Sequence, residues 1–349
     1  AAWQTNMPRG VTPISHAIYH LHMLVFWVCV GIAIVVFSIM IYSLIRHRKS
    51  RGVNAAQFHE NFFLEIAWAI VPFIILIVIA IPATKTLIKM NDNSDSELTI
   101  KVTGYQWRWH YAYLDQGIDF FSNLSTPVEE LQNEAKKNQW YLLEVDHPLV
   151  VPIHKKIRFL FTSNDVIHSW WVPTLGIKRD TIPGFINEAW AKIDTAGTYR
   201  GQCAELCGTN HAFMPIVVKV VSQEDYTKWV EGKKKEMAST SDDPSKVYTL
   251  DEQKERGAKV YAANCAACHQ PNGKGAGTFP ALDGSKVVTG PKEAQYNILI
   301  NGKNAMPKWA GVISDGDIAA VMTYTRNAWG NKSGEVIQTQ EIITARGGK

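Results

Sequence analysis

The stretch Gly201–Pro215, "GQCAELCGTNHAFMP", holds two cysteines, a histidine and a methionine at successive spacings of four, four and three. A disulfide between Cys203 and Cys207 would leave His211 and Met214 without a role. Zinc takes thiolates and imidazoles, but a thioether has no place in its usual ligand sets. Thiolate, imidazole and thioether ligands together suit copper. Two cysteines in one cluster suggest two thiolates that bridge a pair of copper ions.

A pair of copper ions needs a second imidazole from elsewhere in the chain. His168, in "NDVIHSWWVP", follows the predicted strand "KIRFLFTS" on a loop and is the best candidate. His147 and His154 are expected at the surface. Short β-rich segments separated by Pro and Gly occupy residues 97–230, and strands of this length and spacing predict an all-β sandwich. Cupredoxin-like sandwiches build copper sites from one early loop and one late loop.

Two apolar runs precede this domain, within an N-terminal region at 1–96. The runs, at about 24–44 and 62–83, contain no charged residue except Glu65. A helix of this length reaches roughly 30 Å, enough to cross a bilayer. The loop between them carries Arg46, Arg48, Lys49 and Arg51, so the positive-inside rule places it in the cytoplasm and both termini on the periplasmic or outer side. The start "AAWQTN" suggests that a signal peptide has been removed.

Two residues inside the runs need separate interpretation. Glu65 lies near the cytoplasmic end of the second run. It is either a helix-end carboxylate that reaches the interface or a proton-entrance group, and the residues alone favour neither. Cys29 is unpaired and mid-span, and we expect it to act as a small apolar residue.

Composition restricts the partners. The formal net charge of +4 is small, and the basic residues are not gathered with aromatic residues on one face. No nucleic-acid partner is therefore expected. Four of the five cysteines form two tight pairs, which favours metal or cofactor chemistry over a disulfide framework.

The second cysteine pair lies after a polar, charged segment at 231–248 that lacks periodicity and predicts a flexible linker. In "CAACH", Cys265, Cys268 and His269 have the spacing of a c-type heme attachment site, with both thiols bound to heme and His269 on the iron. The adjacent histidine argues against a redox disulfide. The lack of a second CxxC argues against a zinc knuckle.

Two methionines follow the heme motif and could supply the other axial ligand. Met306 lies in the Gly-rich segment "NGKNAMPKW" and is preferred, whereas Met322 lies in an amphipathic helix and is expected in the core. A Met–His ligand pair raises the heme potential. The heme domain is placed at 249–330, followed by a C-terminal tail at 331–349 that is expected to be strand-like or mobile.

The motifs "GYQWRWHY", "DVIHSWWVPTLGIKRDTIPG" and "GQCAELCGTNHAFMPIVV", with the hairpin and "LEIAWAIVP", resemble subunit II of heme–copper cytochrome c oxidase. The resemblance implies a binuclear CuA centre. Its ligands would be the two cysteines as bridges, one imidazole on each copper, a weak thioether and one backbone carbonyl: Cys203, Cys207, His168, His211, Met214 and Glu205.

The same resemblance implies three further roles. The Glu205 side chain would bind a magnesium or manganese ion at the boundary with subunit I. Trp107 would receive electrons for the copper centre, and Glu65 would stand at the mouth of a proton channel. Trp107 and Trp109, two residues apart, are expected to point to one face of a strand.

The last domain resembles a class I cytochrome c. The expected fold is therefore multidomain: a two-helix transmembrane hairpin, a cupredoxin-like sandwich and an all-α cytochrome c domain. The implied function is a membrane-bound relay in which a cytochrome or other external donor reduces heme c, then CuA, then the heme of subunit I, where O2 is reduced to water with proton pumping. Subunits I and III and the bacterial cytoplasmic membrane would be its partners.

Three alternative functions fit the sequence less well. A CuA subunit of a nitric oxide reductase is disfavoured by the hairpin with Glu65. A quinol oxidase subunit is disfavoured because that family has lost the copper ligands. A copper carrier or sensor is disfavoured by the heme motif beside the copper cluster.

Overall fold

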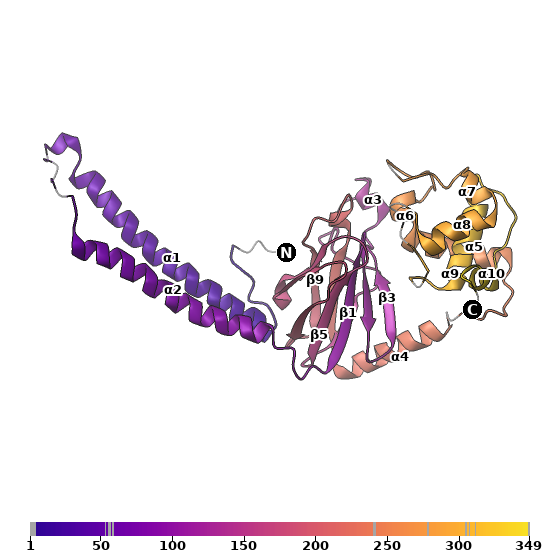
Figure 1. Cartoon of the computed structure of the whole chain (residues 1–349), viewed down its shortest axis with the longest axis horizontal. Helices are drawn as coiled ribbons and strands as arrows, with labels where there is room; N and C mark the ends of the chain where they lie inside the picture. The colour runs from indigo at the N-terminus through magenta and orange to yellow at the C-terminus, as the bar shows by residue number, and fades with distance from the viewer. Residues whose placement is uncertain are drawn as a thin grey trace. The chain divides into compact units, whose positions relative to one another are not determined.

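Two long apolar helices open the chain, α1 (Pro13–Arg46) and α2 (Phe62–Met90), with a short 3₁₀ turn η1 (Lys49–Arg51) between them. They pack side by side as a hairpin (Figure 1). Both are long and apolar enough to cross a membrane, and the most apolar window of each is unburied. α1 begins well before the predicted span because Pro13 and the Thr12 capping box start the helix early.

This computed structural model describes residues 5–52, 54, 57, 59–239, 242–277, 279–303, 306, 308–310 and 312–347. The chain divides into two compact units, Ala1–Glu231 and Gly232–Lys349, and each is described by itself.

Within the first unit, the start of α1 and the end of α2 are tied to the β-domain. The Thr12 hydroxyl donates to the Leu175 carbonyl at 2.9 Å. The Trp190 indole N–H donates to the Lys89 carbonyl, also at 2.9 Å. These bonds fix where the membrane helices leave the domain.

The β-domain is a sandwich of two five-stranded sheets, ordered β3-β2-β1-β5-β8 and β4-β10-β9-β6-β7. The strands are β1 (Leu98–Tyr105), β2 (Arg108–Tyr113), β3 (Ile118–Ser122), β4 (Leu149–Pro152), β5 (Lys156–Ser163), β6 (His168–Val172), β7 (Ile177–Thr181), β8 (Asn187–Lys192), β9 (Gly197–Cys203) and β10 (Pro215–Val221). Short helical pieces α3 (Val128–Leu131), η2 (Pro173–Leu175) and η3 (His211–Phe213) lie in the loops. The strands confirm the predicted all-β architecture.

The sandwich core forms because alternate residues of each strand face inward. In β5 every second residue is buried, and Phe159 and Phe161 pack on Trp170 of β6 with ring centroids 5.5 and 5.7 Å away. Aromatic burial of this size holds the two sheets face to face and makes a rigid base for the loops at one end.

Trp107 and Trp109 do not share a strand face, so that prediction is wrong. β1 pairs with β2 as a hairpin in which Tyr105 is opposite Arg108, and Trp107 lies in the two-residue turn between them. Trp109 lies in β2 and is fully buried. The continuous aromatic run hides the turn, because no Gly, Pro, Asn or Asp marks it.

The second unit is helical, with α5 (Leu250–Asn264), α6 (Ala266–His269), α7 (Lys286–Thr289), α8 (Lys292–Asn301), α9 (Asp315–Asn327) and α10 (Thr339–Ala345). Its core is built mainly where α5 packs on α9, around Val260, Tyr261, Ile318 and Met322. The predicted all-α domain is confirmed.

The prediction of a flexible linker at 231–248 is wrong for residues 231–239, which are helical. Helix α4 covers Gln223–Ser239, since Lys, Glu, Met and Ala favour helix and charged pairs such as Lys228–Glu224, 2.6 Å apart, support it. Apolar periodicity is weak there because the helix is mostly solvent-exposed. After it, Asp242 accepts hydrogen bonds from the Gly316 amide at 2.6 Å and from Arg256 at 2.8 Å, which anchors this segment to the helical unit.

The segment 331–349, set apart as a tail, is part of the helical unit over its described residues. Ile337 and Ile342 are fully buried in the core. Gln253 of α5 donates to the Ile337 carbonyl at 2.9 Å, and Asn331 donates to the Leu282 carbonyl at 3.0 Å. These partners lie far away in the sequence, so the tail has no local pattern of its own.

The crossing of α5 over α9 predicts a mutational effect. A Cβ atom at Gly257 would lie 2.1 Å from the Ala320 carbonyl oxygen, so Gly257→Ala must push the helices apart. We expect the free energy of unfolding of this unit to fall by about 1–3 kcal/mol. Denaturant unfolding of the full chain, followed at the α5–α9 packing through Tyr and Trp fluorescence, measures the change.

Gly232→Ala in α4 is the matched control, because nothing lies within 4 Å of a Cβ there. It should be neutral or stabilising by up to about 1 kcal/mol through helix propensity. Equal unfolding midpoints for the two variants would contradict a tight α5–α9 contact.

Candidate metal and heme sites

The fold gathers the sulfur-containing residues of Gly201–Pro215 at one end of the sandwich. β9 ends at Cys203 and β10 starts at Pro215, and the loop between them folds back on itself through η3. Cys207 Sγ lies 3.8 Å from Cys203 Sγ, 3.5 Å from His211 Nδ1 and 3.5 Å from Met214 Sδ. Neither cysteine forms a disulfide. Cys207 is therefore the centre of the cluster.

His168 reaches the same cluster from β6, which pairs with β9 in the same sheet. It is the first residue of β6 and not a loop residue as predicted. Its ligand atom and the sulfurs of Cys203 and Cys207 all lie within 4.8 Å of one another. Its Nε2 is 2.8 Å from Asp165 Oδ1, whereas its buried Nδ1 has no hydrogen-bond partner. The imidazole is thus held at one nitrogen and left open at the other.

Gly104 makes room for this ring. A Cβ atom at position 104 would lie 2.7 Å from His168 Cδ2. Gly104 is in β1, directly opposite Trp109 across the hairpin. A residue with a side chain here would displace the imidazole from the sulfur cluster.

The electrostatics of the cysteine pair favour one thiolate. The pKa of Cys203 is lowered, chiefly because the Cys207 thiol donates a hydrogen bond to its sulfur. The same contact and burial raise the pKa of Cys207. Burial disfavours a charged His168, but its contacts with Asp165 and Cys203 outweigh this and raise its pKa. A bound cation would favour release of the remaining thiol proton.

The remaining predicted residues of this end surround the cluster. The Glu205 carbonyl oxygen lies 3.3 Å from Cys203 Sγ, while the Glu205 side chain is exposed. The Trp107 indole N–H donates to the Cys207 carbonyl at 3.1 Å, and that of Trp109 to the Met214 carbonyl at 3.2 Å. Both tryptophans therefore touch the backbone of the cluster loop, one from the partly exposed turn and one from the core.

The other predicted residues of this unit lie away from the cluster. Glu65 is in the exposed first turn of α2, where the Asn61 amide donates to its Oε1 at 3.4 Å. His147 pairs with Asp146 and His154 with Asp194, at 3.3 and 3.8 Å, near the surface.

The second site is an apolar cavity of about 460 Å³ in the helical unit. Its lining includes Cys265, Cys268, His269, Leu299, Met306 and Val321. His269 Nδ1 lies 2.9 Å from the Pro280 carbonyl, which fixes this nitrogen as the donor and leaves Nε2 as the ligand atom. Mutual backbone hydrogen bonds of 2.9 Å between Lys303 and Met306 hold the methionine at the cavity. Met322 is fully buried in the core and does not line the cavity.

Sequence reasoning missed Gly104 and Asp165 at the first site. Asp165 precedes His168 by three residues, the spacing of a local side-chain contact, and this was the available signal. Gly104 has no such signal, since its neighbour His168 is distant in the sequence.

The chain combines a membrane hairpin, a domain with a sulfur–imidazole cluster and a domain with a CxxCH motif at an apolar cavity. These features define the class of membrane-anchored electron-transfer proteins. Comparison with known families identifies the family within this class. The family model for the transmembrane domain of cytochrome c oxidase subunit II matches residues 1–86, and that for its periplasmic domain matches 98–221. The model for cbb3-type cytochrome c oxidase subunit III matches 252–324.

Individual relatives agree. The chain is 38% identical over 237 residues to a probable cytochrome c oxidase subunit 2 of Rickettsia bellii, which covers 68% of this chain and 87% of the relative. It is 37% identical over 240 residues to cytochrome c oxidase subunit 2 of Cereibacter sphaeroides, covering 65% and 79%. The solved periplasmic domain of subunit II from Bradyrhizobium japonicum is 44% identical, covers 41% of this chain and 96% of that one, and has a TM-score of 0.37.

The chain therefore belongs to the family of cytochrome c oxidase subunit II, and it carries a C-terminal cytochrome c domain. The resemblance drawn from the motifs is confirmed, as is the multidomain fold. The chain is a membrane subunit of an oxidoreductase complex, with an electron-transfer role in that complex.

Proposed function

We propose that the chain is the electron-accepting subunit of a respiratory terminal oxidase. It takes electrons from an external donor at its cytochrome c domain and delivers them through the β-sandwich to subunit I, where O2 is reduced to water with proton pumping. The observation that carries this proposal is the convergence of Cys203, Cys207 and His168, whose ligand atoms lie within 4.8 Å of one another, together with a buried imidazole nitrogen that has no hydrogen-bond partner.

The residues at the sandwich end fit a pair of copper ions. Cys203 and Cys207 would bridge the two metals, His168 and His211 would each bind one, and Met214 and the Glu205 carbonyl would complete the set. Bound copper would supply a one-electron centre with charge shared over both metals. The chain's own contribution is rigidity, because both cysteines and Met214 are buried on a loop tied to Trp107 and Trp109.

The cavity of the helical unit fits a covalent heme. Cys265 and Cys268 would attach it, and His269 and Met306 would hold the iron. Bound heme would supply a second one-electron centre. The apolar lining excludes water, and the His269–Pro280 hydrogen bond orients the ligand imidazole.

Further roles complete the proposal. Trp107 would receive electrons for the copper centre, because its indole N–H donates a hydrogen bond to the Cys207 carbonyl. The exposed Glu205 side chain would help bind a magnesium or manganese ion at the boundary with subunit I.

Glu65, in the first turn of α2, would serve as a proton-channel entrance on the cytoplasmic side. Both redox domains would then face the periplasm of a bacterial cytoplasmic membrane, and subunit III would be a further partner.

Spectroscopy of the purified full chain, matured with heme and supplied with copper, tests this function. The expected result is a low-spin c-type heme together with an EPR signal in which one electron is shared by two equivalent copper nuclei. A heme without copper, or with one isolated copper, would overturn the relay.

Met306 and Met322 allow a sharp test of heme ligation. Met306→Ala should lower the heme potential by on the order of 0.1 V, within the ~0.8 V range that axial ligands set. The loss of a thioether ligand favours the ferric state. Met322→Leu, a conservative change in the core, should leave the heme potential unchanged. A redox titration of both variants compares them, and an equal response would exclude Met306 as the ligand.

A further inference from the structure

Asp165 lies in the loop that precedes β6 and forms several hydrogen bonds there. Its Oδ1 lies 2.8 Å from His168 Nε2 and accepts from the Val166 amide at 2.7 Å. Its Oδ2 accepts from the Gln106 amide at 2.7 Å. The side chain is only 21% exposed. One carboxylate therefore links the imidazole of β6 to the turn between β1 and β2.

Gln106 continues this link to the cluster loop. Its side-chain amide donates to the Cys207 carbonyl at 2.8 Å, the same oxygen that accepts from the Trp107 indole. The two candidate ligands His168 and Cys207 come from segments almost forty residues apart. Asp165 and Gln106 join them through three hydrogen bonds, and Trp107 is attached to the same junction.

We propose that Asp165 is a positioning residue of the metal centre, which fixes the orientation and basicity of the His168 imidazole and locks it to the turn that carries Trp107. This inference rests on the proposed function, because it assigns His168 Nδ1 as a metal ligand. With Nε2–H donating to Asp165, the lone pair of the buried Nδ1 stays available, and a ligand atom of His168 lies within 4.8 Å of both sulfurs.

Two physical effects follow from a carboxylate in this place. A hydrogen bond to the far nitrogen fixes the tautomer of a metal-bound imidazole and increases its basicity. A negative charge close to the centre also favours the oxidised, more positive state. Asp165 should therefore tighten metal binding and lower the reduction potential of the centre.

A purely structural role for Asp165 predicts something different. The carboxylate also accepts from the amide of the next residue, a local contact that organises a turn. If that were its whole purpose, its loss would reduce stability and leave the potential and spectrum of a bound metal unchanged. The potential is therefore the decisive measurement.

The experiment uses the full chain, matured with heme, and compares wild type with Asp165→Asn and Asp165→Ala. Asp146→Asn is the matched control. Asp146 is 33% exposed, accepts two hydrogen bonds from Asn123 and contacts His147, but it lies outside the cluster. Copper is titrated against a competing chelator, the EPR spectrum is recorded, and the copper potential is measured. The heme spectrum of the same sample reports whether the chain is folded.

We expect Asp165→Asn to weaken copper binding about 10–100-fold, to change the copper hyperfine pattern and to raise the copper potential. Asp165→Ala should have at least the same effect, and Asp146→Asn should match wild type. A wild-type affinity and potential in both Asp165 variants would overturn the inference. Equal losses in Asp165→Asn and Asp146→Asn would overturn it as well, whereas absence of copper from wild type would overturn the proposed function itself.

Discussion

Cys207→Ser is expected to abolish the two-copper EPR signal and to reduce electron delivery to the oxidase by more than about 100-fold, beyond the 10–100-fold typical of outer-shell changes. Cys207 Sγ is the atom common to three contacts of the cluster, those with Cys203, His211 and Met214. A serine hydroxyl is harder than a thiolate and titrates far above neutral pH. It cannot replace a bridging sulfur between soft metals.

The measurement has two parts. Copper content and EPR of the purified chain report the centre, and stopped-flow reduction of the assembled oxidase reports electron delivery. Cys29→Ser is the control, since Cys29 is an exposed thiol in α1. It should leave both readings at the wild-type value. A two-copper signal that survived in Cys207→Ser would show that this sulfur does not bridge the metals.

Much of this architecture was predictable because its signals are local. Two long uncharged runs specify membrane helices, and the CxxCH motif specifies its own geometry within one turn of α6. The cluster loop Gly201–Pro215 likewise contains most of its candidate ligands. Each of these features depends on neighbours in the sequence, so periodicity and spacing were enough.

The parts that could not be predicted depend on distant partners. Gly104 is needed because the His168 ring packs against it. Ile337 is buried because it packs in the core with α9 and its carbonyl accepts a hydrogen bond from Gln253. Helix α4 is mostly exposed, and Tyr226 and Trp229 near its start provide its apolar contacts with the sandwich, so a search for periodicity overlooks it. The turn at Trp107 lacks turn-forming residues, and only the pairing of β1 with β2 reveals it.

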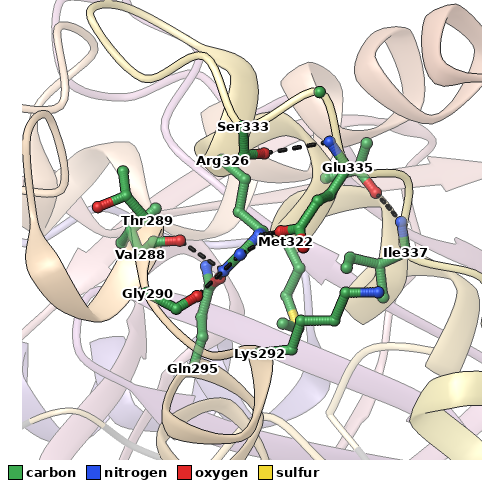
Figure 2. Close-up of polar contacts among 12 residues, drawn as sticks. Val288, Thr289, Gly290, Lys292, Gln295, Met322, Arg326, Ser333, Glu335 and Ile337 are labelled. Carbon is green, nitrogen blue, oxygen red and sulfur yellow. Dashed lines mark hydrogen bonds and ion pairs between the residues drawn. The ribbon is translucent and has the colours of Figure 1, made fainter.

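Arg326 of α9 combines several such distant contacts. Its guanidinium is buried, and all its N–H groups have acceptors in Glu335, the carbonyls of Val288 and Gly290, and Gln295 (Figure 2). The Arg326 side chain is 2% exposed, whereas that of Glu335 is 40% exposed. One side chain thus ties α9 to the end of α7 and to the segment that leads into α10.

Arg326→Met is expected to lower the free energy of unfolding of the helical unit by about 3 kcal/mol. This is the lower end of the cost of breaking a buried ion pair, because Glu335 can be hydrated once its partner is lost. The carbonyls of Val288 and Gly290 would remain buried without their donor, which contributes to the loss. Denaturant unfolding of the heme-loaded full chain, followed by the heme absorption band, measures it.

Lys292→Met provides the comparison within the same unit. Lys292 and Glu341 form an ion pair of 2.9 Å with side chains 28% and 36% exposed, so its loss should cost only about 0–1 kcal/mol. Arg326→Lys should recover only part of the stability, because an ammonium has three donors and lacks the planar fork. If Arg326→Met and Lys292→Met shifted the unfolding midpoint equally, burial would not distinguish the two pairs. Because Val288 and Gln295 also line the apolar cavity proposed to hold heme, the Arg326 variants should broaden the heme band before global unfolding, whereas Lys292→Met should not.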